Sequence, residues 1–388
     1  MRVGNAIYMD YQSTTPLDPA AREAMLPFMG DKFGNPHSSS HRFGWEADAS
    51  IEVARGQVAE LAGVNVDDLY FTSGATESNN TAIKGLALGR RGARGKIITI
   101  ATEHSCVLES ARASALFGQE IEILPVQPDG LIDLNRLENA LSPETFIVSV
   151  MAVNNEIGVI QPIREIAEIV HAKGAWLHCD AAQALGKLPL YEISPYCDLM
   201  SFSGHKIYGP KGVGALYVKR EVTRSIMPLM HGGGQEGLLR SGTLAPALCV
   251  GFGKACAIAA QQLDTEKARA ERHFEQFIAG VAGFDVTAQL NGSAHARLKS
   301  NINLSFEGID SAKLMSSLRR LSVSSGAACA SAKEGPSYVL DALGIEKRMA
   351  DASLRIGTGR YTDDGQIDDA LNYLEDALNK SRRRSWTK

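Results

Sequence analysis

The sequence has no apolar run long enough to cross a bilayer and no signal-peptide-like apolar segment near its N-terminus. Its charges nearly balance, at a formal net charge of −4, so composition favours neither nucleic acid nor an anionic membrane as a partner. The six cysteines include no C-x-x-C pair, which argues against a zinc site and a disulfide framework. We therefore expect a cytoplasmic protein with no metal, membrane or nucleic-acid ligand.

What is present is a globular composition arranged as alternating strands and helices. With 44% hydrophobic residues, the 388-residue chain can bury a large core, which suits one large domain and one smaller domain. Strands are expected at 96–101, 120–124 and 146–151, and helices at 105–117, 133–141 and 162–173. This alternation predicts an α/β fold whose mostly parallel, doubly wound sheet is connected by right-handed crossovers.

The later part of the chain has a different pattern. A long helix is expected from Pro246 to Ile278, and residues 301–306 alternate apolar and polar side chains as a half-buried strand does. Because the regular alternation of strand and helix is lost here, this region indicates a smaller α+β domain. We expect the large domain to cover 15–260 and the small domain to combine 1–14 with 261–388.

An acid and a lysine follow two of the expected strands. The apolar run 175–179 ends at Asp180, and Lys206 precedes a Gly/Pro-rich turn and the strand-like run 213–218. Taken singly, Asp180 could be a helix N-cap and Lys206 a solvated turn residue. As a pair they suit pyridoxal phosphate, which needs an amine for its aldehyde and a carboxylate for its ring nitrogen. Open α/β sheets bring such groups together at the carboxyl ends of their strands.

A glycine turn from Thr72 to Thr76 lies between an expected strand and an expected helix. Such a turn points free backbone N–H groups and the positive end of the helix dipole at an anion. Capping of the helix by Ser73 or Thr76 is the simpler alternative. A nucleotide-binding module is the competing class of protein, because Gly204 and Gly209 have the spacing of a phosphate-binding loop. However, Pro210 stands where such a loop requires lysine.

The motifs Asp180-Ala181-Ala182-Gln183 and Ser203-Gly204-His205-Lys206 resemble the cofactor motifs of class V, fold-type I pyridoxal-phosphate enzymes. More narrowly, the chain resembles the NifS/IscS-type cysteine desulfurases from Tyr8 to Arg360. The resemblance implies the fold-type I transferase fold and pyridoxal 5'-phosphate as cofactor. It assigns cofactor binding to Ala75, Thr76, His104, Asn155, Asp180, Gln183, Ser203, His205, Lys206 and Thr243, and substrate binding to Asn155 and Arg355.

Several of these roles depend on the resemblance alone. His104 would stack on the cofactor ring and shuttle protons, although a histidine after a strand is often structural. Asn155, otherwise a turn residue, would reach the ring oxygen or the substrate. Thr243 would contact the phosphate of a neighbouring subunit, which implies a homodimer. Arg355 could be a surface charge, but its apolar neighbours favour a partly buried guanidinium suited to the substrate carboxylate.

The segment Ser-Ser-Gly-Ala-Ala-Cys that ends at Cys329 resembles the Ser-Ser-Gly-x-Ala-Cys loop of the same group. Small polar neighbours would leave this thiol accessible, as a nucleophile must be. The resemblance implies that Lys206 acts as base at Cα and that Cys329 takes the sulfur of L-cysteine as a persulfide, leaving L-alanine. An acceptor or scaffold protein would receive the sulfur for iron–sulfur cluster or thio-cofactor synthesis. Selenocysteine lyase and other class V enzymes remain alternatives.

Overall fold

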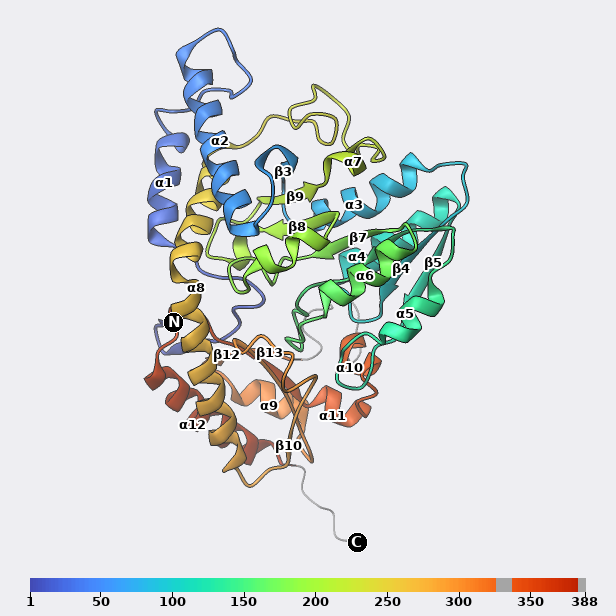
Figure 1. The fold of residues 1–388 in the computed structure, drawn as a ribbon. Coiled ribbons are helices and arrows are strands. Elements are labelled where there is room, and N and C mark those ends of the chain that lie inside the picture. The colour runs from blue at the N-terminus through green and yellow to red at the C-terminus, as the bar shows by residue number, and fades with distance from the viewer. Residues whose placement is uncertain (326–336, 383–388) are drawn as a thin grey trace.

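The computed structural model describes residues 1–325 and 337–382, in which a large part and a smaller part are joined by one long helix (Figure 1). The large part is built on a seven-stranded sheet with the order β3-β9-β8-β7-β6-β4-β5. Its strands are β3 (Leu69–Thr72), β4 (Gly95–Ile100), β5 (Gln119–Leu124), β6 (Thr145–Ser149), β7 (Trp176–Asp180), β8 (Leu199–Ser203) and β9 (Gly214–Val218). All neighbours pair in parallel except β9, which is antiparallel to both β3 and β8.

Helices cover both faces of this sheet. They are α1 (Pro19–Met29), α2 (Arg42–Ala62), α3 (Ala75–Gly89), α4 (Ser105–Ser114), α5 (Leu134–Ala140), α6 (Ile163–Ala172) and α7 (Arg220–Thr223). Short 3-10 helices are η1 (Val66–Asp68), η2 (Ala115–Phe117), η3 (Leu190–Glu192), η4 (Ser194–Tyr196) and η5 (Gly204–Lys206). One core joins the sheet to α2 and α6, and another joins it to α3 and α4.

Successive residues of the strands enter different cores. Val148 of β6 belongs to the core under α2 and α6, whereas Ile147 belongs to the core under α3 and α4. A sheet buried on both faces produces continuous apolar runs, which explains why its strands were recognisable from sequence. The prediction of an α/β fold with a mostly parallel, doubly wound sheet is confirmed.

The smaller part contains two short sheets and its own helices. The four-stranded sheet has the order β10-β11-β14-β13, and the three-stranded sheet has the order β1-β2-β12. These strands are β1 (Arg2–Val3), β2 (Ala6–Tyr8), β10 (Ala288–Leu290), β11 (Asn301–Phe306), β12 (Leu321–Ser322), β13 (Ser324–Ser325) and β14 (Ser353–Gly357). The helices are α9 (Ser311–Ser317), α10 (Tyr338–Ala342), α11 (Lys347–Asp351) and α12 (Asp364–Ser381).

The long helix α8 (Pro246–Ala282) bridges the two parts (Figure 1). Its Phe252 lies in the core under α2 and α6, and its Phe277 lies in the core of the smaller part. Ile7 also belongs to that second core although it is near the N-terminus. On these contacts we propose the domain division expected from sequence, with 15–260 in one domain and 1–14 and 261–388 in the other.

One expectation about the smaller part is wrong. Strand β11 is not half-buried, since all six of its residues are buried. Its polar side chains face other polar groups instead of solvent: Asn303 Nδ2 donates to the carbonyl of Glu156 at 3.1 Å, and Asn291 Nδ2 donates to Ser305 Oγ at 2.8 Å. The alternating residues of β11 therefore face an apolar core on one side and buried polar groups on the other.

Residues 1–325 and 337–382 contain no helix long and apolar enough to cross a membrane.

Candidate active site

A cavity of about 520 Å³ opens at the carboxyl ends of β7 and β8, next to the start of α3. Of the residues predicted from sequence, Ala75, Thr76, His104, Asn155, Asp180, Gln183, Ser203, His205, Lys206 and Arg355 all line it. Lys206 and Asp180, which were predicted to converge, therefore line one shared cavity. Its position matches the rule that open α/β sheets bind ligands beyond their strand ends.

Lys206 lies in η5, directly after β8, and its amine is held by backbone. Nζ donates to the carbonyl oxygens of Gln12 at 2.8 Å and Ser13 at 2.6 Å. The side chain of Gln183 donates to the same Gln12 carbonyl at 2.8 Å. The N-terminal segment thus forms part of the cavity wall. Its contact with Lys206 joins residues almost 200 positions apart, which no local sequence pattern indicates.

Asp180 is the last residue of β7 and is 5% exposed. Its Oδ1 accepts from the backbone N–H of Ala182 at 2.9 Å, but a turn and not a helix follows β7 there, so the helix N-cap alternative is wrong. Its Oδ2 accepts from Asn79 Nδ2 at 2.7 Å. Asn79 was missed from sequence, because nothing in α3 alone shows that its buried face meets the end of β7. The two bonds fix the carboxylate in one orientation at the cavity floor.

The start of α3 is built as an open anion site. Gly74 precedes it at φ 145, a conformation that side chains with a Cβ rarely adopt, and no side chain of the described residues caps the helix. Ala75 and Thr76 therefore present their backbone N–H groups together with the positive end of the helix dipole. Ser203, at the end of β8, lines the same cavity.

His205 lies beside this anion site as a neutral imidazole. Burial, followed by the charges of Lys206 and Lys211, lowers the pKa of His205 to about 4. Its Nδ1 lies 3.0 Å from Thr14 Oγ1. Lys211 also lines the cavity, so it is a further cation near the anion site that was not assigned from sequence.

His104 caps α4 and lines the cavity from the β4 side. Its Nδ1 accepts from the backbone N–H of Cys106 at 3.2 Å, and the Cys106 sulfur lies 3.0 Å from the same nitrogen. An acceptor at Nδ1 places the proton of the neutral ring on Nε2. Burial lowers the pKa of His104 and, together with Asp180, raises the pKa of Cys106 to about 12, so this thiol is not a ready nucleophile.

Arg355 reaches the cavity from β14 of the smaller part and is 2% exposed. Its Nη2 donates to Asp10 Oδ1 at 2.7 Å and to Ser324 Oγ at 3.0 Å, and its Nη1 donates to the carbonyl of Asn155 at 3.2 Å. The interpretation of Arg355 as a surface charge is wrong, and a buried guanidinium is found. Asp10 and Ser324 were not identified from sequence, because they meet Arg355 only through the sheet packing.

Two predicted residues are not placed in this cavity. Thr243 is exposed, in the segment before α8, and does not line the cavity. Cys329 lies outside the described residues. Within residues 1–325 and 337–382, no group of three or more His, Cys, Asp or Glu side chains could hold a metal ion.

The residues present fit pyridoxal phosphate. The uncapped start of α3 with Ser203 suits a phosphate, and buried Asp180 suits a protonated ring nitrogen. Lys206 lines the same cavity and is the only lysine besides Lys211 among its described lining residues.

The comparisons with known proteins show the family of the chain. The family description "Aminotransferase class-V" matches residues 7–370, so the chain belongs to the class-V aminotransferase family. A curated relative named cysteine desulfurase IscS, from Rickettsia bellii (strain OSU 85-389), is 48% identical over 376 residues, which cover 97% of this chain and 92% of the relative.

Two solved structures extend the comparison to three dimensions. A "NifS-like protein" is 35% identical with a TM-score of 0.89, and the match covers 98% of this chain and 100% of that one. The structure titled "SspA in complex with cysteine" is 36% identical with a TM-score of 0.82, over 92% of this chain and 99% of that one. The predicted resemblance to NifS/IscS-type cysteine desulfurases is confirmed.

Proposed function

We propose that this chain is a pyridoxal-phosphate-dependent cysteine desulfurase that converts L-cysteine to L-alanine and takes the sulfur onto Cys329 as a persulfide. The observation that carries the proposal is the convergence of Lys206, Asp180 and the uncapped start of α3 on one cavity. The relatives supply the reaction class, because the curated protein above is named a cysteine desulfurase and one solved structure is titled a complex with cysteine.

When bound, the cofactor supplies an electron sink for the electrons released at the substrate Cα. The backbone N–H groups of Ala75 and Thr76, with Ser203, bind its phosphate. Neutral His205 adds a hydrogen-bonding group there without a titratable charge at neutral pH. Asp180 would keep the ring nitrogen of the cofactor protonated, and Lys206 would hold the aldehyde and then move the proton at the substrate Cα.

The other cavity residues orient the ring and the substrate. When the cofactor is bound, His104 would contact its ring, and Asn155 and Gln183 would bind its phenolic oxygen. Arg355 binds the substrate α-carboxylate, for which the fork of the guanidinium is suited. Because Asp10 already pairs with Nη2, the substrate carboxylate must share Arg355 with Asp10 or displace it.

The sulfur step belongs to Cys329. Its thiolate attacks the substrate Sγ, so that an S–S bond forms while the Cβ–Sγ bond breaks. The electron pair of the broken bond stays with the carbon fragment, which is protonated to alanine. The persulfide then passes its outer sulfur to an acceptor or scaffold protein, in iron–sulfur cluster or thio-cofactor synthesis.

A homodimer in the cytoplasm is part of the same proposal. Its support is the position of Thr243, which is exposed and does not line the cavity of its own chain. In this homodimer, Thr243 would contact the phosphate bound to the partner chain.

The proposal is tested by replacing Cys329 with alanine. We expect Cys329→Ala to retain the yellow colour of bound cofactor and to lose alanine and sulfide formation from cysteine by at least about a hundredfold. Cys249→Ala is the matched control, since Cys249 is a buried core residue of α8 and burial raises the pKa of its thiol to about 12. Wild-type turnover in Cys329→Ala would exclude the persulfide mechanism.

A further inference from the structure

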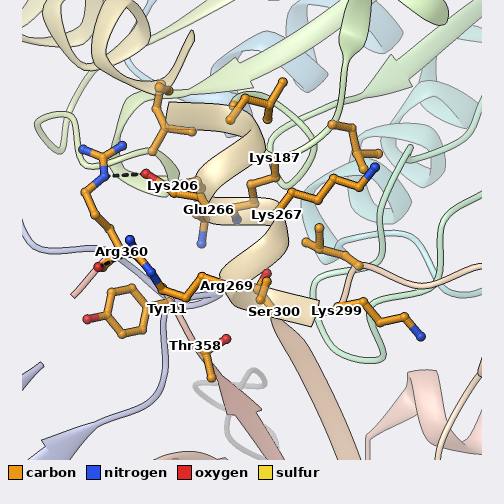
Figure 2. Close-up of a pocket in the computed structure, with 18 of the residues that line it drawn as sticks. Tyr11, Lys187, Lys206, Glu266, Lys267, Arg269, Lys299, Ser300, Thr358 and Arg360 are labelled. Carbon is orange, nitrogen blue, oxygen red and sulfur yellow. Dashed lines mark hydrogen bonds and ion pairs between the residues drawn. The ribbon is translucent and has the colours of Figure 1, made fainter. Parts of the chain in front are cut away.

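A second cavity of about 380 Å³ lies on the other side of Lys206, between α8 and the end of β14 (Figure 2). Gln12 and Lys206 line both cavities, so these two residues form part of the wall between them. Several cationic side chains surround the second space, among them Lys187, Lys267 and Arg269 (Figure 2). None of the roles proposed above uses this cavity.

Lys187 connects the two cavities. It lines the second cavity, while its Nζ donates to Gln183 Oε1 at 2.8 Å, and Gln183 lines the first cavity. Among residues 1–325 and 337–382, Lys187 makes no ion pair with an acid, and its hydrogen-bond partner is the Gln183 amide. Burial, followed by the charge of Lys206, lowers the pKa of Lys187 to about 7, and Glu266 acts in the opposite direction.

The Gln183 amide is constrained from both ends. Its Nε2 donates to the Gln12 carbonyl at 2.8 Å, and a carbonyl can only accept. Its Oε1 accepts from Lys187, which in its ammonium form can only donate. A flipped amide would set oxygen against the carbonyl whatever the charge of Lys187, and it would set NH₂ against the ammonium form. The Gln12 carbonyl therefore specifies the orientation, and protonated Lys187 specifies the same one.

The Gln12 carbonyl ties this chain of bonds to the reactive lysine. It accepts from Lys206 Nζ at 2.8 Å as well as from Gln183. A continuous path thus runs from Lys187 through the Gln183 amide and the Gln12 carbonyl to Lys206. Lys187 itself does not line the first cavity, so its hydrogen-bonding contact with that cavity passes through Gln183, while its charge acts through space on Lys206 and His205.

We propose that Lys187 is a positioning residue that holds the Gln183 amide with its nitrogen toward the active site. The oxygen of the amide is taken by Lys187, so the group offered to the first cavity is a hydrogen-bond donor. A donor is what a phenolate oxygen needs, whereas an acceptor would repel it. The orientation of the amide follows from these contacts alone, whereas its effect on the cofactor depends on the proposed function.

The test compares two lysines of the second cavity in the holoenzyme. Lys187→Met keeps the length of the side chain and removes the donor, and we expect kcat/KM for cysteine to fall about tenfold with a shifted visible band of the cofactor. Lys267→Met is the matched control, because Lys267 lines the same cavity from α8 without contacting Gln183, and neither quantity should change. Equal behaviour of the two variants would overturn the proposal.

A double-variant cycle separates positioning from a general loss of packing. Gln183→Met removes the amide, so adding Lys187→Met to it should cost no further activity. If the activity losses of the two single variants multiply in the double variant, Lys187 acts independently of Gln183, and the proposal is wrong.

A final measurement does not depend on the reaction. The side-chain amide resonances of Gln183, assigned by their loss in Gln183→Met, should shift in Lys187→Met and remain in place in Lys267→Met. Resonances unchanged by Lys187→Met would overturn the proposal. If the wild-type protein formed no alanine from cysteine, the proposed function would fail, and this comparison would still decide the orientation of the amide.

Discussion

The seven-stranded central sheet and the four-stranded small sheet deliver residues to the same cavity in different ways. The central sheet delivers them where its parallel strands end, with Asp180 as the last residue of β7 and Ser203 as the last residue of β8. The small antiparallel sheet delivers Arg355 from the middle of β14 and Ser324 from β13. Parallel strands align their carboxyl ends at one edge, so position along the strand predicts the site. Antiparallel strands give no such rule.

The residues also differ in how they are held. Lys206 donates to two backbone carbonyls, whereas Arg355 is held by the side chains of Asp10 and Ser324 together with one carbonyl. Backbone partners are fixed by the fold, but a side-chain partner such as Asp10 can be exchanged for a substrate carboxylate. Under the proposed function, the central sheet would therefore supply the chemistry, and the small sheet would supply an exchangeable binding group.

The strongest test of this contrast is Lys206→Ala. Because we propose that Lys206 moves the proton at Cα, we expect alanine formation to fall by about a thousandfold or more. Rates of alanine release at saturating cysteine measure the effect. Borohydride reduction of the wild-type protein should leave the cofactor mass on the peptide that contains residue 206. A variant that turns over normally, or a label on another lysine, would contradict the assignment.

A smaller effect is expected at the other sheet. Arg355→Gln removes the fork that binds the substrate carboxylate, so KM for cysteine should rise by about tenfold to a hundredfold, with less change in kcat. Steady-state kinetics separate the two constants.

Loss of Arg355 also leaves Asp10 without the 2.7 Å ion pair, which is costly for a partly buried acid. The double variant Asp10→Asn with Arg355→Gln removes both charges and serves as the control for folding. If KM returned to its wild-type value in the double variant, Arg355 would act on stability and not on substrate binding.

The same contrast explains what could be predicted from the sequence. Asp180 was found because it ends an apolar run, Lys206 because it precedes a Gly/Pro-rich turn, and the long helix was predicted with the start at Pro246 that α8 has. Gln12 was missed, since its carbonyl meets Lys206 only through folding across most of the chain. Asn79 was missed for the same reason, because only the packing of α3 on the sheet brings it to Asp180.

The error at β11 is of another kind. Its period of two was recognised correctly, but the sequence does not tell whether a polar face meets solvent or a buried polar partner. Here Asn303 bonds across to the carbonyl of Glu156, which follows β6 of the central sheet. Glu156 therefore lies where the two parts of the molecule meet. Replacing it tests the smallest of the expected effects, a change in stability at this contact.

Glu156 is 4% exposed, and burial raises its pKa to about 7, although a hydrogen bond with Ser337 opposes the shift. Between its ordinary pKa of 4.5 and about 7, the folded protein keeps a proton that the unfolded chain releases. Stability from this group is therefore present at low pH and is lost as pH rises to about 7. Glu156→Gln should remove that loss and stabilise the holoenzyme at pH 8 by about 2–3 kcal/mol, with little change at pH 5.

Urea unfolding at the two pH values, at equal protein concentration, measures this difference. Glu168→Gln is the control, because Glu168 is an exposed acid on α6 and its loss should not change the pH dependence. A stabilisation by Glu156→Gln of the same size at pH 5 and pH 8 would contradict a buried acid that titrates. The contact between the central sheet and the four-stranded sheet would then be stabilised by the hydrogen bonds of the amide and not by the removal of a charge.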